Sequence, residues 1–337
     1  MRILFAALKY DYGIEERGYS FEYYSFYDTL VRMGYEVEYF DFYTLFKEYG
    51  SLKMTQLLRE KVEEFKPDLL FSFLYSNEFD FNELLRISKE TKTVTYNWFA
   101  DDHWRFDNFS RHWAWCFKFV STTDRKAFVK YKAMGFNNVL LTQWAANTAI
   151  WKKSELEPIY DVTFIGQLHG NRRKVIKELK KLGVEVKVWG PGWAVKPWHS
   201  GLRKLRLINQ KQYQKIIDST RLSQDDMIRV LQRSKISINL TASSQLGTNQ
   251  IKGRNFEIPA CGRLQISDYA DYLEEYFEYD KEIVVFNSLE ELAEKIKYYL
   301  THDSEREEIA LSGYKRVLKE HTYEHRFREL FKQMGLL

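Results

Sequence analysis

The sequence predicts an α/β protein built from two successive doubly wound parallel sheets. Its 337 residues exceed what one hydrophobic core usually holds. Short apolar runs of strand type alternate with helical stretches in both halves, which is typical of parallel sheets covered by helices. A polar joint, Trp151–Pro158, separates the halves, and the pattern restarts after it. We therefore expect an N-terminal domain over residues 1–150 and a C-terminal domain over residues 159–320.

The first half alternates strands and helices. Asp68–Leu74 (DLLFSFL) is mostly apolar, as in strands buried on both faces. Gly34 and Gly135 follow helical stretches and serve as C-terminal stops. The other strands are expected at Arg2–Leu8, Val37–Phe42, Thr93–Phe99, Cys116–Ser121 and Asn138–Thr142. The helices are expected at Phe21–Met33, Leu52–Phe65, Phe81–Lys89 and Asp124–Met134.

The second half repeats this alternation and ends in two helices. Its strands are expected at Val162–Ile165, Val184–Trp189, Ile236–Leu240, Leu264–Ser267 and Ile283–Phe286. Its helices are expected at Arg172–Leu182, Asp225–Ser234, Phe256–Cys261, Leu289–Leu300 and Asp303–Glu320. A further helical stretch around Arg326 follows.

Composition excludes several classes of protein. The net charge of +4 is too small to demand a nucleic-acid partner. The two cysteines, Cys116 and Cys261, provide neither a disulfide framework nor zinc-ligand spacing. The N-terminus turns polar too early for a secretory signal, and no apolar stretch approaches the roughly 18 residues of a membrane span. We expect a cytoplasmic protein without a metal site, and peripheral membrane contact stays open.

The first candidate site follows the strand Val162–Ile165. Gly166 lets backbone approach a ligand, and a helix begins near Arg172, where helix N-terminal amides favour an anion. Arg172 and Arg173 add forked donors that match phosphate oxygens. A solvated basic turn is the alternative interpretation.

The second candidate site lies in Leu240–Gly262. Small and polar residues follow the strand, and ligands of open α/β sheets bind outside the carboxyl ends of strands. The candidate donor-binding residues are Ser243, Ser244, Gly247, Thr248, Asn249, Lys252, Arg254 and Glu257. Lysine and arginine can neutralise a diphosphate, and a glutamate one turn into the helix can accept hydrogen bonds from a ribose diol. For Glu257, a structural ion pair is the alternative.

In the first half, Asp101, Asp102 and His103 follow the strand Thr93–Phe99. They are candidates to accept a proton from an acceptor hydroxyl or to position a donor sugar; an ordinary loop is the alternative. The loop Lys9–Gly18 is another candidate, through Asp11, Gly13, Glu16 and Arg17. An aromatic run after it can pack a core or stack on sugar rings.

Trp193–Lys215 holds basic residues, two tryptophans and several leucines, but no acidic residue. Such a stretch can lie on anionic lipid or hold an anionic acceptor. A surface excursion without a partner is the alternative.

The segments GRNFEIPACGRLQISDY and EEYFEYDKEIVVFNSLEELAEKIKYYL, with the tail from His321 to Arg326, resemble the spore-maturation CgeB-like branch of the group 1 glycosyltransferases. The resemblance is clearest over residues 160–330. It implies the GT-B fold, in which two Rossmann-like domains face a cleft, and we expect residues 321–337 to pack on the N-terminal domain. By position it makes Glu257 the ribose-binding acid, and Arg172, Lys252 and Arg254 the diphosphate clamp. Asn249 stands where many retaining relatives have a glutamate, so the stereochemistry is undecided.

The resemblance implies transfer of a sugar from a UDP, GDP or dTDP donor to a glycan, protein or lipid hydroxyl, with no cofactor and no metal ion. An epimerase of the same fold and a catalytically silent carbohydrate- or nucleotide-binding protein are the alternatives. A nucleic-acid-modifying transferase is a third, weakened by the modest charge.

Overall fold

A computed structural model describes residues 1–243, 245 and 248–337. By its internal contacts the chain forms two compact units. Unit 1 comprises Met1–Asn147 and Thr322–Leu337, and unit 2 comprises Thr148–His321. Each unit holds one sheet with parallel pairing throughout its named strands, which confirms the predicted fold class.

The sheet of unit 1 has the strand order β2-β1-β3-β4-β5-β6. Its strands are β1 (Arg2–Ala7), β2 (Glu36–Asp41), β3 (Leu69–Ser72), β4 (Val94–Phe99), β5 (Phe119–Thr122) and β6 (Val139–Leu141). The chain leaves β1 toward one edge and later returns on its other side, so the order reverses between β1 and β3. Such a reversal is the switch point at which open α/β sheets bind ligands.

Helices cover both faces of this sheet. The α-helices are α1 (Asp28–Arg32), α2 (Phe42–Phe65), α3 (Phe81–Glu90), α4 (Asp102–Arg105), α5 (Arg111–Trp113), α6 (Arg125–Ala133) and α14 (Tyr323–Gln333). Short turns of other helix types lie at Asp11–Gly13, Glu15–Arg17, Tyr23–Tyr27, Phe106–Ser110 and Ala114–Cys116.

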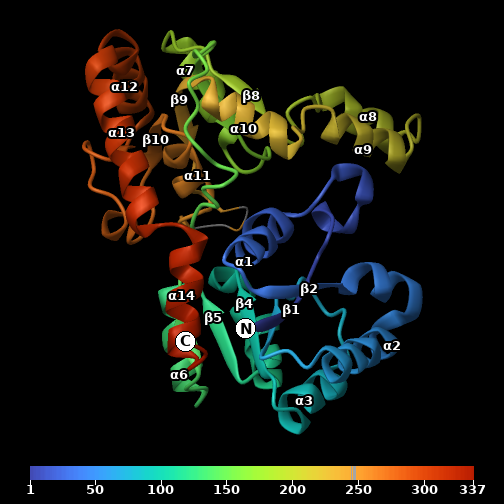
Figure 1. Ribbon diagram of the computed structural model, residues 1–337. Coiled ribbons are helices and arrows are strands. Elements are labelled where there is room, and N and C mark those ends of the chain that lie inside the picture. Colours follow the sequence, from blue (N-terminus) through green and yellow to red (C-terminus); the bar gives the residue numbers. More distant parts are fainter. Residues whose placement is uncertain (244, 246–247) are drawn as a thin grey trace. The chain divides into compact units, whose positions relative to one another are not determined.

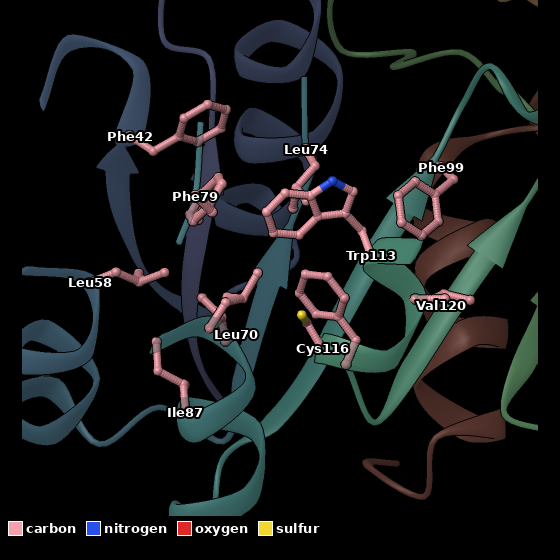
Figure 2. Close-up of a cluster of buried hydrophobic side chains, with 14 of the residues drawn as sticks. Phe42, Leu58, Leu70, Leu74, Phe79, Ile87, Phe99, Trp113, Cys116 and Val120 are labelled. Carbon is pink, nitrogen blue, oxygen red and sulfur yellow. The ribbon is translucent and has the colours of Figure 1, made fainter. Parts of the chain in front are cut away.

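Alternate residues of β1 point to opposite faces, as the strand period requires. Leu4 and Ala6 join the core formed with α2, α3 and α6, part of which Figure 2 shows around Leu70 and Trp113. Phe5, on the other face, packs with α1 and α14. Both faces of the strand are therefore buried, which explains the unbroken apolar runs.

The C-terminal helix α14 belongs to unit 1. Thr322 caps it by accepting a hydrogen bond from the His325 amide (3.2 Å). The Tyr323 ring lies 4.9 Å from that of Phe26, and the Phe327 ring 5.6 Å from that of Phe71. Arg326 donates to the Gln143 carbonyl (3.2 Å). Aromatic burial therefore holds the end of the chain on the first sheet.

The sheet of unit 2 has the order β11-β10-β9-β7-β8. Its strands are β7 (Tyr160–Ile165), β8 (Lys187–Trp189), β9 (Ser234–Asn239), β10 (Leu264–Asp268) and β11 (Val284–Phe286). The order reverses between β7 and β9, which makes this the switch point of the second sheet.

The helices of unit 2 include one pair that the sequence reading missed, α8 and α9. They are α7 (Arg172–Lys181), α8 (Pro197–Lys204), α9 (Gln210–Asp218), α10 (Gln224–Gln232), α11 (Arg254–Ala260), α12 (Leu289–Thr301) and α13 (Asp303–Glu320), with a short turn at Leu273–Glu275. Among the helices that the structure describes, none combines the length and apolar character needed to cross a bilayer.

Two helical predictions in the first half needed correction. The helix expected at Leu52–Phe65 begins at Phe42 and is kinked at Gly50, whose φ of 77° interrupts the helical backbone. The stretch from Asp102 to Cys116, where the sequence predicted no helix and a strand beginning at Cys116, is a series of short helical turns. Local helical contacts there form without a long apolar period, which is why the pattern was not visible.

Candidate functional site

Two basic side chains meet at the switch point of unit 2. Arg172 opens α7 just after β7, and Lys252 precedes α11. Both donate to the same backbone oxygen: the Arg172 Nη2 to Leu240 O distance is 2.9 Å, and the Lys252 Nζ to Leu240 O distance is 3.2 Å. Lys252 also donates to Ala242 O (2.7 Å). Residues far apart in sequence therefore bring two cations to one point at the carboxyl end of β9.

Crowding and burial disfavour positive charge at this point. Burial lowers the pKa of Lys252 to about 7, and Arg172 adds to the fall while Asp268 opposes it. Burial likewise lowers the pKa of Arg172 to about 10, and the pKa of the nearby His169 to about 4. Arg172, Lys252 and His169 are called the basic cluster below. An anion placed among them would relieve the repulsion between the cations.

The structure explains why position 166 is a glycine, and the explanation differs from the expected approach of a ligand. A Cβ built on it would lie 2.9 Å from the Phe164 ring and 3.1 Å from Arg172 Nη1. A Cβ on Gly190, whose φ is +130°, would lie 2.3 Å from the Gly166 carbonyl oxygen. The missing side chains thus let the Arg172 guanidinium and the end of β8 approach this backbone.

The structure places Arg173 away from the Leu240 carbonyl. Its Nη2 donates to carbonyl oxygens of the turn after β8, at 3.3 Å (Gly192), 3.4 Å (Trp193) and 3.0 Å (Val195). Its guanidinium also lies over the Trp193 ring, 5.9 Å from the centroid. This arginine shapes the turn beside the basic cluster.

Arg254 and Glu257 pair with each other. The distance from Arg254 Nη1 to Glu257 Oε2 is 3.0 Å, and the guanidinium also contacts the Trp151 ring and Met227. Burial raises the pKa of Glu257, and the Arg254 charge opposes the rise. This is the ion pair named above as the alternative for Glu257, and it directs Arg254 toward Trp151.

The loop after β9 folds back on itself. Ala242 and Asn249 form an antiparallel bridge, and the Ser243 amide donates to the Thr248 carbonyl (2.9 Å). The Asn249 side chain donates to Tyr269 O (3.2 Å). Ser244 and Gly247, also expected in this site, lie outside the described residues.

Unit 1 contains a cavity of about 270 Å³ at its own switch point. It is lined after β1 by Leu8, after β3 by Tyr75 and after β4 by Asp101. Further aromatic and polar side chains complete it: Asp11, Tyr12, Ser20, Phe21, Glu22, Phe73, Phe99, Arg105, Phe109, Ser110 and Trp144. Aromatic walls with a few carboxylates suit a polyhydroxylated ligand. We call this space the acidic cavity.

Glu22, which sequence reasoning missed, stands out among these lining residues. Burial raises its pKa to about 7, hydrogen bonding to Ser20 opposes the rise, and the nearby Asp11 adds to it. Ser20 itself caps the first turn by accepting from the Tyr23 amide (3.1 Å) and donates to the Leu8 carbonyl. The carboxyl group is thus set at the cavity wall with a pKa suited to exchange a proton near neutral pH.

The side chains of the three predicted catalytic residues have different surroundings. Asp101 lines the acidic cavity. Asp102 is buried, accepts from the Tyr131 hydroxyl (3.2 Å), and is not among the lining residues. Burial raises the pKa of Asp102 to about 6. His103 is half-buried in α4 and does not line the cavity. Of the three, Asp101 reaches the cavity wall, and a proton-accepting role for Asp102 or His103 stays a prediction.

Comparisons with known proteins show what this chain is similar to. Residues 172–332 match the family described as glycosyl transferase-like. The chain is 24% identical to the spore protein CgeB of Bacillus subtilis (strain 168), over 78% of this chain and 82% of that protein. The chain is thus similar to CgeB and, over its C-terminal half, to glycosyl transferase-like proteins.

Solved structures share the GT-B fold with this chain. The Anabaena protein HepE in complex with UDP has a TM-score of 0.62 at 11% identity, with both chains fully covered. Its complex with UDP-glucose gives 0.61 at 12% identity, again over both full chains. The sucrose-phosphate synthase of Thermosynechococcus elongatus gives 0.59 at 9% identity, over 99% of each chain. The likeness extends over both units.

Proposed function

We propose that this chain transfers a sugar from a UDP-sugar to an acceptor hydroxyl, and that the basic cluster binds the diphosphate without a metal ion. The convergence of Arg172 and Lys252 on the Leu240 carbonyl carries this proposal. Two cationic side chains at the mouth of a switch point match the negative charge of a diphosphate. UDP is the nucleotide in the HepE complexes, which makes it the first donor to test.

Catalysis by unit 2 would come from stabilising the leaving group. As the bond to the sugar breaks, negative charge grows on the diphosphate, and one well-placed donor in a dry site is worth roughly 3 to 4 kcal/mol. Lys252 now donates to two carbonyl oxygens. It can turn from them to phosphate oxygens, because its long side chain carries three donors.

The acceptor would bind in the acidic cavity of unit 1. Aromatic rings there, including Tyr75 and Trp144, can stack on a sugar ring. Glu22 would accept the proton of the attacking hydroxyl if transfer inverts the anomeric centre; if it retains, the departing phosphate takes that proton.

Lys252→Ala tests the donor half of the proposal. Loss of one charged hydrogen bond should weaken UDP binding about 10- to 100-fold and change uridine binding less than about twofold, as measured by titration calorimetry. Lys235→Ala, which removes an ion pair with Asp161 in the same unit, is the control. Equal losses for UDP and uridine would move the diphosphate elsewhere.

Turnover tests the reaction itself. We expect UDP-sugar with a panel of sugar, peptide and lipid acceptors to give a new glycoside, with the rate unchanged by a chelator. Formation of an epimerised sugar in the absence of any acceptor would instead identify an epimerase, and binding without conversion a silent nucleotide-binding protein.

A further inference from the structure

The helices α8 and α9 of unit 2 form a hairpin whose own helices bury nothing. Every residue of both helices is described, and none of them is buried. The two helices contact each other through side chains at their surfaces: the Ser200 hydroxyl lies 3.4 Å from the Tyr213 hydroxyl, and the Arg203 guanidinium lies over the Tyr213 ring at 5.0 Å. Figure 1 shows the two helices side by side. A helix with apolar residues normally buries one face, so this hairpin lacks a cover.

Large apolar side chains of the hairpin are unusually exposed. Trp198 is 62% exposed, Leu205 70% and Leu207 67%. The two leucines have the highest exposed fractions among the large apolar residues that the structure describes. Several large apolar side chains left exposed within one short segment are typical of a binding surface.

The same hairpin is strongly basic. Between residues 196 and 215 the sequence has no aspartate or glutamate. All of the lysines and arginines there are exposed: Lys196, Arg203, Lys204, Arg206, Lys211 and Lys215. The partner surface must therefore tolerate or attract positive charge.

We propose that this hairpin docks on an anionic lipid bilayer, with Trp198, Leu205 and Leu207 entering the interface and the basic side chains contacting lipid phosphates. A dissolved polyanion would pair with the cations but leave the leucines in water. A second copy placed by two-fold symmetry would bring like charges together. Lipid satisfies both features, because its headgroups are negative and the layer beneath them accepts apolar side chains.

Vesicle sedimentation tests the proposal on the full chain. We expect binding to vesicles of phosphatidylcholine with phosphatidylglycerol, weakening as salt is added, and little binding to phosphatidylcholine alone. The triple variant Trp198→Ala, Leu205→Ala and Leu207→Ala should bind the anionic vesicles at least about tenfold more weakly at every salt concentration. The variant Arg203→Gln, Lys204→Gln and Arg206→Gln should lose about as much at low salt and show a smaller salt dependence.

Leu311→Ala with Leu318→Ala is the matched control, since both leucines are exposed on α13 of the same unit, and it should bind vesicles like the unmodified chain. UDP affinity should be unchanged in all variants, so this test stands apart from the proposed function. No binding to anionic vesicles, or equal binding by the apolar variant, would overturn the proposal; the second result would indicate a polyanion. A dimer that both hairpin variants dissociate in analytical ultracentrifugation would also overturn it, in favour of a second copy.

Discussion

At the switch point of the first sheet, between β1 and β3, the chain places the carboxyl groups of Asp11, Glu22 and Asp101 around a cavity with aromatic walls. At the switch point of the second sheet, between β7 and β9, it places Arg172 and Lys252 around one carbonyl oxygen. The backbone topology is alike in the two places. The difference teaches that topology sets where a site forms, while the loop side chains set what it binds.

Burial acts on the two places in opposite directions and with a common result. It raises the pKa of the Glu22 carboxyl to about 7 and lowers the pKa of the Lys252 ammonium to about 7, because a low-dielectric site disfavours either charge. Each site therefore holds a group that can gain or lose a proton near neutral pH. Variants of Glu22 and Lys252 test whether the first group transfers a proton and the second binds phosphate.

Glu22→Gln should have the largest effect of these variants, and it should lower the rate of turnover without changing UDP binding. Removing a general base costs about 10²- to 10⁴-fold in rate, and the amide keeps the size of the side chain. We expect kcat to fall by that factor in steady-state assays, with the Kd of UDP unchanged. Glu90→Gln, exposed on α3 of the same unit, is the control.

An undiminished kcat in Glu22→Gln would mean that Glu22 is not the general base. Glu22 would then only position the acceptor, or the reaction would retain the anomeric configuration and the departing phosphate would take the proton. The comparison would then reduce to two binding sites of opposite charge.

Arg254→Ala should mainly reduce stability. It leaves the buried Glu257 carboxylate without its partner, which costs about 3 to 5 kcal/mol of unfolding free energy. Arg229→Ala, which breaks an exposed pair with Asp226, should cost at most about 1 kcal/mol. Urea denaturation measures both.

The pH dependence of Arg254→Ala has a definite sign. Burial already raises the folded-state pKa of Glu257 above its unfolded value, and loss of Arg254 raises it further. The destabilisation is therefore absent below the unfolded pKa and grows as pH rises through the folded one. A variant as stable as the unmodified chain at every pH would show that Glu257 has another partner.

Much of this fold could be predicted from the sequence, because parallel strands buried on both faces leave mostly apolar runs such as Asp68–Leu74. The stops at Gly34 and Gly135 are confirmed by their positive φ angles of 80° and 86°. The meeting of Arg172 and Lys252 was predictable for a similar reason: the carboxyl ends of parallel strands share one edge of the sheet.

Other features depend on tertiary surroundings that local pattern does not show. In the sequence Glu22 resembles any acidic residue in a first helical turn, where a negative charge interacts favourably with the helix dipole. Only the folded cavity gives its carboxyl group an unusual pKa. Arg254 and Glu257 have the i,i+3 spacing of an ion pair, but sequence cannot choose between that pair and a ligand. The hairpin of α8 and α9 was missed because its apolar residues cover no core.

Lys252→Arg should have the smallest effect and is the sharpest test of the lysine's charge. Between pH 7 and 9 the free chain loses the Lys252 proton, because the pKa of this lysine is about 7, whereas UDP is already largely ionised, since the second pKa of a terminal phosphate is about 6. Since UDP binds the protonated form better, its affinity should fall about tenfold across this range, one charged hydrogen bond being worth about 1.5 kcal/mol. Arginine remains charged at these pH values, so titration calorimetry of Lys252→Arg should give a nearly flat profile. A flat profile in the unmodified chain would mean that Lys252 has the same charge in the free and the UDP-bound chain. Lys252 would then not be a group that changes its protonation near neutral pH, as is inferred for Glu22.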